Sequence, residues 1–312
     1  MKPARIVVIG SVNTDLFMHL DRLPRPGETI RLGSFRQQGG GKGANLAIAA
    51  ARLGAHVTLV AAVGNDEAGR NAIAELLAAG VDVSRVRVAG VPTGTAMIMV
   101  DRQGENMIGV DAGANELLSR SDVEAALADP ELADPVVIAN LEVPLEPVRT
   151  ASTIARDKGW PFVLNPAPPR ELDSEIIDGC ALMTPNIQEV GRLGYRSAVA
   201  LLAAGAHAVV VTRGADGADL LRPGLPTLHQ DPFPVDSVDS TGSGDAFSAA
   251  LSCALAEGLI ITDALRRAAA AGAVAARTAG ARVGIAIATE IDSLVACPDI
   301  GKQHITGNPA SY

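Results

Sequence analysis

Short apolar runs alternate with amphipathic patterns along most of the chain, and this alternation limits the possible folds more than any other feature. Apolar runs that read as buried strands lie at 6–9, 57–61, 136–139, 162–164, 181–183 and 208–211. Segments with the periodicity of amphipathic helices lie at 43–53, 69–79, 121–128, 145–158, 196–204, 245–257 and 262–278. Strands that alternate with helices at this spacing form a mainly parallel sheet with helices on both faces. The sequence therefore predicts an α/β fold of this kind.

Two stretches interrupt the alternation and are expected to form a small antiparallel lid. Residues 16–38 alternate loosely, and residues 95–110 alternate on both sides of a polar turn, as a β-hairpin does. Because both interrupt an α/β body, we expect them to lie together over one end of the main sheet. The predicted organisation is one body with a lid and a flexible tail: body 1–297, lid about 14–38 and 93–110, tail 298–312.

Composition and charge argue against several classes of protein. The chain has 312 residues, 48% hydrophobic and 20% charged, which is a globular composition. Its net charge of -9 argues against a nucleic-acid partner, since phosphate binding needs clustered Lys and Arg. The apolar run 268–276 is about half the length of a membrane span, and the first apolar run is too short for a signal peptide. We expect a cytoplasmic protein with neither a nucleic-acid nor a membrane partner.

The sharpest chemical signal is a glycine-rich turn that opens a helix, Asp239-Ser240-Thr241-Gly242-Ser243-Gly244-Asp245. Its glycines allow tight backbone conformations, and a helix N-terminus adds positive potential, so the turn can hold an anion. Asp245 follows directly and could take a proton from a hydroxyl while the amides stabilise a transferred phosphoryl group. The alternative is that Asp245 only caps the helix.

A second glycine-rich segment, Gly39-Gly40-Gly41-Lys42-Gly43-Ala44-Asn45, also enters a helix. Three consecutive glycines are unfavourable unless a ligand or another backbone approaches closely, and Lys42 and Asn45 add a cation and an amide there. The segment is not a Walker A loop, because Arg36 and Gly43 occupy positions of its first glycine and its Ser/Thr. The alternative is a strand-to-helix turn with a solvated lysine.

Polar residues also follow the expected strands, at the edge where open α/β sheets bind ligands. Asn13 and Asp15 follow the first strand, where Val12 and Asp15 replace glycines of a dinucleotide-binding fingerprint. Either residue could instead be a turn former. Weaker candidates follow four later strands, at Glu142, 165–168, 184–189 and 212–217. Together these groups suit sugar hydroxyls and hydrated Mg²⁺.

With these motifs the chain resembles the ribokinase family, also called the PfkB carbohydrate kinases, over roughly residues 5–295. The two signatures are 40–45 and 239–245, and the stretch 105–115 resembles the ribokinase branch of the family. The resemblance implies a Rossmann-like α/β body with a β lid. It also implies ATP as phosphate donor, Mg²⁺, and a homodimer formed through the lid.

The resemblance further implies roles for individual residues. Sugar contacts are implied for Asn13, Asp15, Gly41, Lys42, Asn45, Glu142 and Asp245. Asp245 is the implied catalytic base, beside an anion hole formed by Gly242, Ser243 and Gly244. Nucleotide contacts are implied for Asn186, Thr212, Gly214 and Gly217. Asn186 and Glu189 match an Asn-x-x-Glu pattern associated with Mg²⁺ and phosphate. Residues that align with a monovalent-cation site, for K⁺, are Asp239, Thr241, Ala275, Thr278 and Gly280.

Three positions depart from the family pattern. Gly284 stands where a serine offers its hydroxyl to the cation, which counts against potassium activation. The span 186–212 is shorter than in the family, and Ala269 lies where relatives often place a polar residue near adenine. These departures bear on the nucleotide and the cation, not on phosphoryl transfer.

The leading hypothesis is ATP-dependent phosphorylation of a primary hydroxyl on a pentose, with ribose giving ribose 5-phosphate. A site that hydrogen-bonds sugar hydroxyls rejects analogues that leave its own polar groups unpaired. Another ketose or hexose kinase stays open, as does a nucleoside kinase, for which the lid offers only Phe17 and Phe35 as aromatic shelf. A sugar-binding sensor would have no use for Asp245 beside an anion hole. The missing dinucleotide glycines count against a dehydrogenase.

Overall fold

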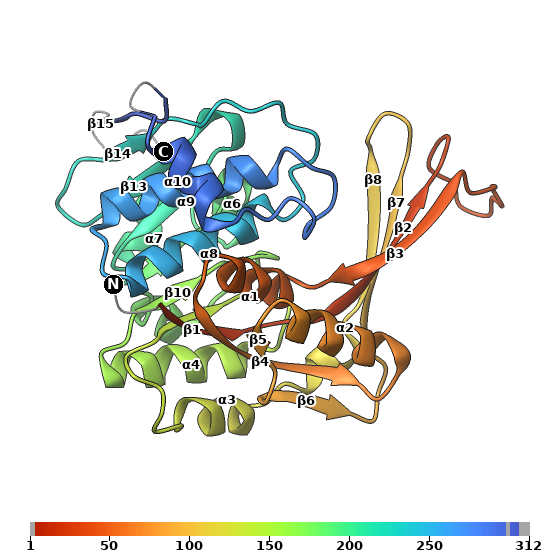
Figure 1. Cartoon of the computed structure of the whole chain (residues 1–312), viewed down its shortest axis with the longest axis horizontal. Helices are drawn as coiled ribbons and strands as arrows, with labels where there is room; N and C mark the ends of the chain where they lie inside the picture. The colour runs from red at the N-terminus through yellow and green to blue at the C-terminus, as the bar shows by residue number, and fades with distance from the viewer. Residues whose placement is uncertain (1–3, 298–299, 306–312) are drawn as a thin grey trace.

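An eleven-stranded sheet runs through the centre of the molecule (Figure 1). The structure, a computed structural model, describes residues 4–297 and 300–305. The parallel part of the sheet contains β1 (Arg5–Ile9), β4 (His56–Gly64), β5 (Val81–Asp82), β6 (Val86–Ala89), β9 (Val136–Ala139), β10 (Phe162–Leu164), β11 (Leu182–Met183) and β12 (Val209–Thr212). The sheet continues antiparallel through β13 (Ala218–Leu221), β14 (Leu228–Gln230) and β15 (Gln303–Ile305).

Helices cover both faces of this sheet, as the alternation predicts. One face packs against α1 (Lys42–Arg52), α2 (Glu67–Ala78), α8 (Ser243–Ala256), α9 (Ile261–Ala275) and α10 (Ala288–Val295). The other packs against α3 (Arg120–Leu127), α4 (Leu145–Lys158), α5 (Ser174–Asp178), α6 (Ile187–Arg192) and α7 (Ala198–Ala203). In β1, Ile6 and Val8 enter the first core while Val7 and Ile9 enter the second. Because successive strand residues face opposite sides, a strand buried on both faces must be continuously apolar.

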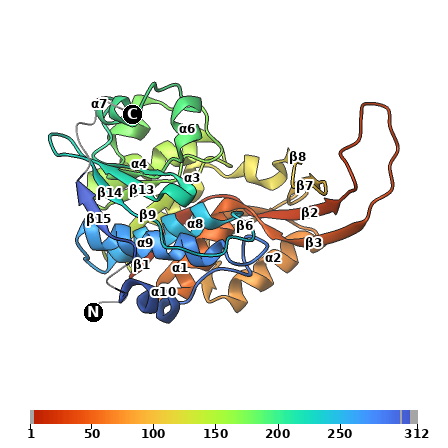
Figure 2. The ribbon, with the colours of Figure 1, turned by 90° about the horizontal axis from the view of Figure 1, so that it is seen from above.

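A separate four-stranded sheet extends away from the body (Figure 1, Figure 2). Its order is β3-β2-β7-β8, with β2 (Asn13–His19), β3 (Ser34–Gly40), β7 (Gly94–Val100) and β8 (Asn106–Asp111). The prediction that this lid is wholly antiparallel was wrong, because β2 and β7 pair in parallel. Each of these two strands begins at the body and runs outward, so they share a direction.

The segment predicted as a flexible tail, 298–312, differs from that prediction in its described part. Gln303–Ile305 forms β15, which pairs antiparallel with β14. The Gln303 side-chain amide donates to Gln230 Oε1 at 2.8 Å and to the carbonyl oxygen of Thr262 at 2.7 Å. Residues 298–299 and 306–312 of that prediction lie outside the described residues. Within the described ranges, no helix has both the length and the apolar character needed to cross a bilayer.

Candidate active site

The motifs from distant parts of the sequence meet where the small sheet joins the body. Lys42 at the start of α1 lies against Glu142 after β9, since its backbone N–H donates to Glu142 Oε2 at 3.0 Å. Asn45 in α1 lies against Asp245 in α8, with 3.0 Å between Nδ2 and Oδ2. In the pairing of β2 with β3, Asn13 lies opposite Gly40, the last residue of β3. The ends of the main strands, two helix N-termini and the base of the small sheet therefore share one site.

Asp245 lies in the first turn of α8, with only 4% of its surface exposed. Gly242, which precedes the helix, has φ +79°, and a Cβ there would lie 2.7 Å from the carbonyl oxygen of Ala281. The close approach of that loop explains why the position is a glycine. The Asp245 carboxylate accepts from the side-chain amides of Asn45 and Asn165, at 3.0 and 3.2 Å. Burial raises the pKa of Asp245, which makes the carboxylate a stronger base than one in water.

The contacts of Asp245 argue against a capping role, because Asn45 and Asn165, which donate to its carboxylate, are side chains from other parts of the chain. The N-cap of α8 is Gly242, which has no side chain to cap the helix. The first N–H groups of a helix have no intrahelical acceptor and can bind an anion. The backbone N–H of Ser243, which was predicted to be part of the anion hole, is already bonded. It donates to the carbonyl oxygen of Ser240 at 3.1 Å. The hydroxyl of Ser243 is buried and, among the described residues, has no hydrogen-bond partner.

Lys42 is half-buried among carboxylates, so it is not the freely solvated side chain of the alternative interpretation. Asp245, followed by Glu142, Glu189 and Asp15, raises the pKa of Lys42. A lysine in this field stays protonated, and its charge stabilises the carboxylate of Asp245 in return. The site therefore places the positively charged ammonium group of Lys42 beside the candidate base, Asp245.

Asn13 and Asp15 lie in β2, so they are not turn formers. Both side chains are largely buried, at 4% and 9% exposed. Asn115 holds the first of them: its Nδ2 donates to Asn13 Oδ1 at 2.7 Å, while its Oδ1 accepts from the Val12 N–H at 2.8 Å. Burial, reinforced by Glu142, raises the pKa of Asp15 to about 6.

The three consecutive glycines each make room for a specific neighbour. A Cβ at Gly39 would collide with the guanidinium of Arg282, and one at Gly40 with the carboxylate of Asp15. Gly41 has φ +89°, and its Cβ would lie 2.7 Å from a backbone nitrogen at the start of β2. The glycine run is therefore a consequence of side chains and backbone packed into the site.

Arg282, which sequence reasoning missed, links the small sheet to the body. Its guanidinium donates to Asn45 Oδ1 at 2.9 Å and to the Gly40 carbonyl oxygen at 2.6 Å, and it pairs with Glu75 of α2. Because the arginine takes the amide oxygen of Asn45, the Nδ2 group of that residue is left to face Asp245. Only a lone charged residue within an Ala/Gly-rich stretch marks this position in the sequence.

The residues predicted to hold the nucleotide lie at the ends of β11 and β12. Asn186 and Thr212 form a parallel bridge between these two strands. Asn186 caps α6 reciprocally with Glu189, and burial raises the pKa of that glutamate. Gly214 and Gly217 bound a short turn after β12, with φ +59° and +83°. The structure brings these residues together and gives two of them a local capping contact.

The predicted monovalent-cation residues lie in the loops around the start of α8 and the end of α9. Asp239 accepts from the Thr241 N–H and hydroxyl, at 2.9 and 2.7 Å, and from the Gly280 N–H at 2.9 Å. A Cβ at Gly284 would lie 2.5 Å from the carbonyl oxygen of Ala275 and 3.2 Å from Thr278 Cβ. The predicted residues are thus neighbours, but the Asp239 carboxylate already has three donors within the loop.

Taken together, the arrangement supplies a buried base, an adjacent cation, a helix N-terminus and a set of buried carboxylates and amides. A base with a raised pKa can accept a proton from an alcohol, and the helix N-terminus can hold the charge of a phosphoryl group. Phosphoryl transfer depends on this kind of positioning and electrostatic stabilisation.

Comparison with known proteins agrees with this chemistry. The family of pfkB family carbohydrate kinases matches residues 3–287. A ribokinase of Bacillus subtilis is 38% identical over 93% of this chain and 99% of its own length. One from Haemophilus influenzae is 33% identical over 90% of this chain and 94% of its own length. A structure of Arabidopsis thaliana ribokinase complexed with ribose and ATP superposes with a TM-score of 0.84 at 30% identity, covering 95% of this chain and 100% of that one. The chain therefore belongs to the pfkB family of carbohydrate kinases.

Proposed function

We propose that this protein transfers the γ-phosphoryl group of ATP to the primary hydroxyl of ribose, giving ribose 5-phosphate. The observation that carries the proposal is the Asp245 carboxylate, buried in the first turn of α8 between the amides of Asn45 and Asn165. The relatives reported above are ribokinases, one of them bound to ribose and ATP. They favour ribose among the sugars.

In the proposed reaction, Asp245 accepts the proton of the sugar hydroxyl as that oxygen attacks the γ-phosphorus. The bond from that phosphorus to the leaving oxygen breaks, and ADP departs. The α8 amides that follow Ser243 and the buried hydroxyl of Ser243 hold the transferred group. Lys42 offsets negative charge that the phosphates bring to the site.

The sugar is proposed to bind between the base of the small sheet and the start of α1. Asp15 and Glu142 provide acceptors for its hydroxyls, and Asn13 and Asn45 provide amides that neighbouring side chains already orient. Gly41 lets the backbone of this segment approach closely. Fixed partners of this kind favour a pentose whose hydroxyls match them.

The nucleotide is proposed to lie along Asn186, Thr212, Gly214 and Gly217, with Mg²⁺ bound to its phosphates. The residues fit a Mg²⁺ ion, because the carboxylate of Glu189 is close enough to Lys42 and Asp245 to interact electrostatically with both. Mg²⁺ usually keeps several waters, so Glu189 would hold it through water. When bound, the ion neutralises charge on the phosphates.

The residues that align with a potassium site fit a cation only in part. The Asp239 carboxylate is already bonded to Thr241 and Gly280, and Gly284 supplies no hydroxyl. We expect activity to persist when potassium is replaced by a large organic cation. A sharp loss of activity in that exchange would show that the protein does use a bound monovalent cation.

The protein is proposed to form a homodimer through its small sheet. Every residue of β8 is exposed, including Ile108 at 55% and Val110 at 61%. By the β7–β8 register these two lie opposite Ile98 and Ala96, on the face that carries Asp15. Apolar side chains gathered on one exposed face indicate an interaction surface, and a second copy would cover it beside the sugar site.

ADP release measured over a panel of acceptors tests the proposed activity. The panel contains ribose, 2-deoxyribose, fructose and inosine, and NMR of the product identifies the phosphorylated oxygen. We expect the highest kcat/KM for ribose, with phosphate on its primary hydroxyl. Preference for inosine would indicate a nucleoside kinase, and sugar binding without ADP release would indicate a sensor.

A further inference from the structure

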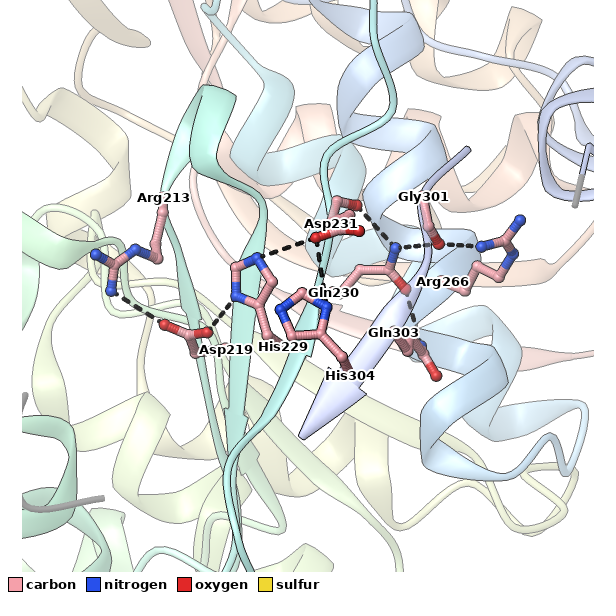
Figure 3. A network of polar contacts seen from close by, with 9 residues as sticks. All are labelled: Arg213, Asp219, His229, Gln230, Asp231, Arg266, Gly301, Gln303 and His304. Carbon is pink, nitrogen blue, oxygen red and sulfur yellow. Dashed lines mark hydrogen bonds and ion pairs between the residues drawn. The ribbon is translucent and has the colours of Figure 1, made fainter. Parts of the chain in front are cut away.

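At the β15 end of the central sheet, three strands place titratable side chains in one row (Figure 3). The register puts Asp219 of β13 opposite His229 of β14, and His229 opposite His304 of β15. Asp231 follows β14 two residues after His229. Directly opposite residues project to the same face of a sheet, so the two imidazoles lie side by side, with 4.9 Å between ring centroids. This cluster has no part in the proposed phosphoryl transfer.

Three of these side chains converge on one point. Asp231 Oδ1 lies 3.6 Å from His229 Nε2 and 3.6 Å from His304 Nδ1. One ligand atom from each side chain lies within 4.8 Å of the other two. Ligand atoms bound tetrahedrally to zinc at about 2.0–2.2 Å are about 3.3–3.5 Å apart. Small side-chain rotations therefore suffice to close the set around an ion.

A buried carboxylate orients one of the two imidazoles. Asp219 has a side chain only 1% exposed, and its Oδ1 lies 2.6 Å from His229 Nδ1. Its other oxygen accepts from Arg213 at 3.0 Å. Because an ionised carboxylate can only accept, the proton of the neutral ring lies on Nδ1 and the lone pair on Nε2. The Nε2 atom faces Asp231, as Figure 3 shows. A carboxylate bonded to the other ring nitrogen, as Asp219 is here, is the usual support of a metal-binding imidazole.

The surroundings leave space for the remaining ligands of an ion. An open cavity of about 440 Å³ lies beside His229 and His304 and reaches Ala215 and Asp216 in the turn after β12. A simple surface ion pair would need only one histidine and one carboxylate, and exposed pairs contribute little stability. Two imidazole nitrogens and a carboxylate oxygen around one point are instead a ligand set suited to zinc and neighbouring transition metals.

We propose that His229, Asp231 and His304 bind one first-row transition-metal ion, Zn²⁺ foremost, with the remaining position open to solvent. Two of the ligands belong to β14 and its following residue, and the third belongs to β15. The bound ion therefore fastens the last described strand to the sheet. Hard cations such as Mg²⁺ and Ca²⁺ prefer all-oxygen ligands and do not compete for the site.

Titration of the untagged protein with Co²⁺ and Zn²⁺, without nucleotide, tests the proposal. The background is Cys297→Ser, because Cys297 is an exposed thiol that would bind the same metals. We expect one Co²⁺ per chain with the visible spectrum of a tetrahedral or five-coordinate site, displaced by Zn²⁺. His304→Ala should weaken binding about 10-fold or more, because it deletes a ligand. Asp219→Asn should weaken it about 10–100-fold, because it replaces the carboxylate that orients His229 and leaves all three ligands in place.

Controls separate this site from other metal binding. His207 is exposed and outside the cluster, so His207→Ala should bind as the background protein does. Zn²⁺ should raise the Tm of the background protein but not of His304→Ala, while Mg²⁺·ATP-dependent kinase activity stays equal in both. Because His304 and Asp231 are both partly exposed, Asp231→Asn serves as a second ligand deletion that spares the core. Equal Zn²⁺ affinity in the background protein and both deletions, or no binding by the background protein, would overturn the proposal.

Discussion

Asp15, which is proposed to bind the sugar, shows how such a residue can oppose stability. Its carboxyl group is protonated in the folded protein up to about pH 6, but only to about pH 4 in the unfolded chain. Between these pH values the folded state therefore holds a proton that the unfolded chain has lost. The contribution of this group to the free energy of unfolding is fully present below about pH 4. It is lost as the pH rises through 6, by about 3 kcal/mol in total.

Replacing Asp15 by asparagine should remove this loss. We expect Asp15→Asn to be about 2–3 kcal/mol more stable than the wild type at pH 8 and nearly equal to it at pH 4. Ribose affinity should fall, because the amide is a weaker acceptor than the carboxylate. Urea unfolding at the two pH values measures the difference. The same pH dependence in both proteins would show that Asp15 is not a strained buried carboxyl.

Arg282 acts at the same scale, through the residues it orients. Arg282→Ala leaves Asn45 Oδ1 and the Gly40 carbonyl oxygen without this donor, and each buried unpaired group costs about 1–3 kcal/mol. We expect a loss of about 2–4 kcal/mol in unfolding free energy, together with a KM for ribose that rises more than the KM for ATP. Denaturant unfolding and steady-state kinetics check this. Arg277→Ala, an exposed arginine in the same region, is the control, and equal effects of both substitutions would exclude a positioning role.

At the scale of elements, the turn from β3 into α1 has no space for larger side chains. A Cβ at Gly40 would lie 2.0–2.3 Å from the Asp15 carboxyl atoms, so Gly40→Ala must displace that side chain. The displaced carboxylate would lose its proposed charge-assisted hydrogen bond to a sugar hydroxyl. Losing one such bond costs about 1.5–3 kcal/mol, which is about tenfold or more in affinity. We expect ribose KM to rise accordingly while the affinity for ATP is unchanged. Gly109→Ala in β8 is the matched control, since nothing lies within 4 Å of its added Cβ.

The small sheet as an element carries the proposed dimer. Ile108→Asp places a charge in the exposed apolar face of β8, where a second copy would have to bury it. We expect a monomer in analytical ultracentrifugation, with lower activity. Val88→Asp in β6 is the control, because Val88 is equally exposed at 56% and lies outside the small sheet. A wild-type monomer, or an Ile108→Asp dimer, would refute this interface.

At the scale of the whole molecule, the features that could be predicted are those encoded by patterns within short stretches of sequence. Continuous apolar strands buried on both faces, such as β1 and β9, and the helices between strands follow from local periodicity. The glycine-rich turns before α1 and α8 likewise carry local signatures. For these reasons the α/β body and the cluster around Asp245 could be expected.

The remaining features depend on partners far away in the sequence. Arg282 contacts Asn45 across 237 positions, and Asn115 contacts Val12 across 103. No local pattern marks such a partner. The strand β15 is only 3 residues long, and its pairing with β14 decides its structure. The parallel direction of β2 and β7 likewise follows from where both strands leave the body.

The central claim for the whole molecule is that these distant segments converge to make Asp245 the base in phosphoryl transfer. Single-turnover phosphorylation of ribose by Asp245→Asn, with ribose and ATP affinities measured by calorimetry, tests it most directly. Asp263→Asn, an exposed aspartate in the first turn of α9, controls for the loss of a helix-terminal charge. We predict a rate about 100–10,000-fold lower in Asp245→Asn, affinities nearly unchanged, and a normal rate in the control. A near-normal rate in Asp245→Asn would contradict the account.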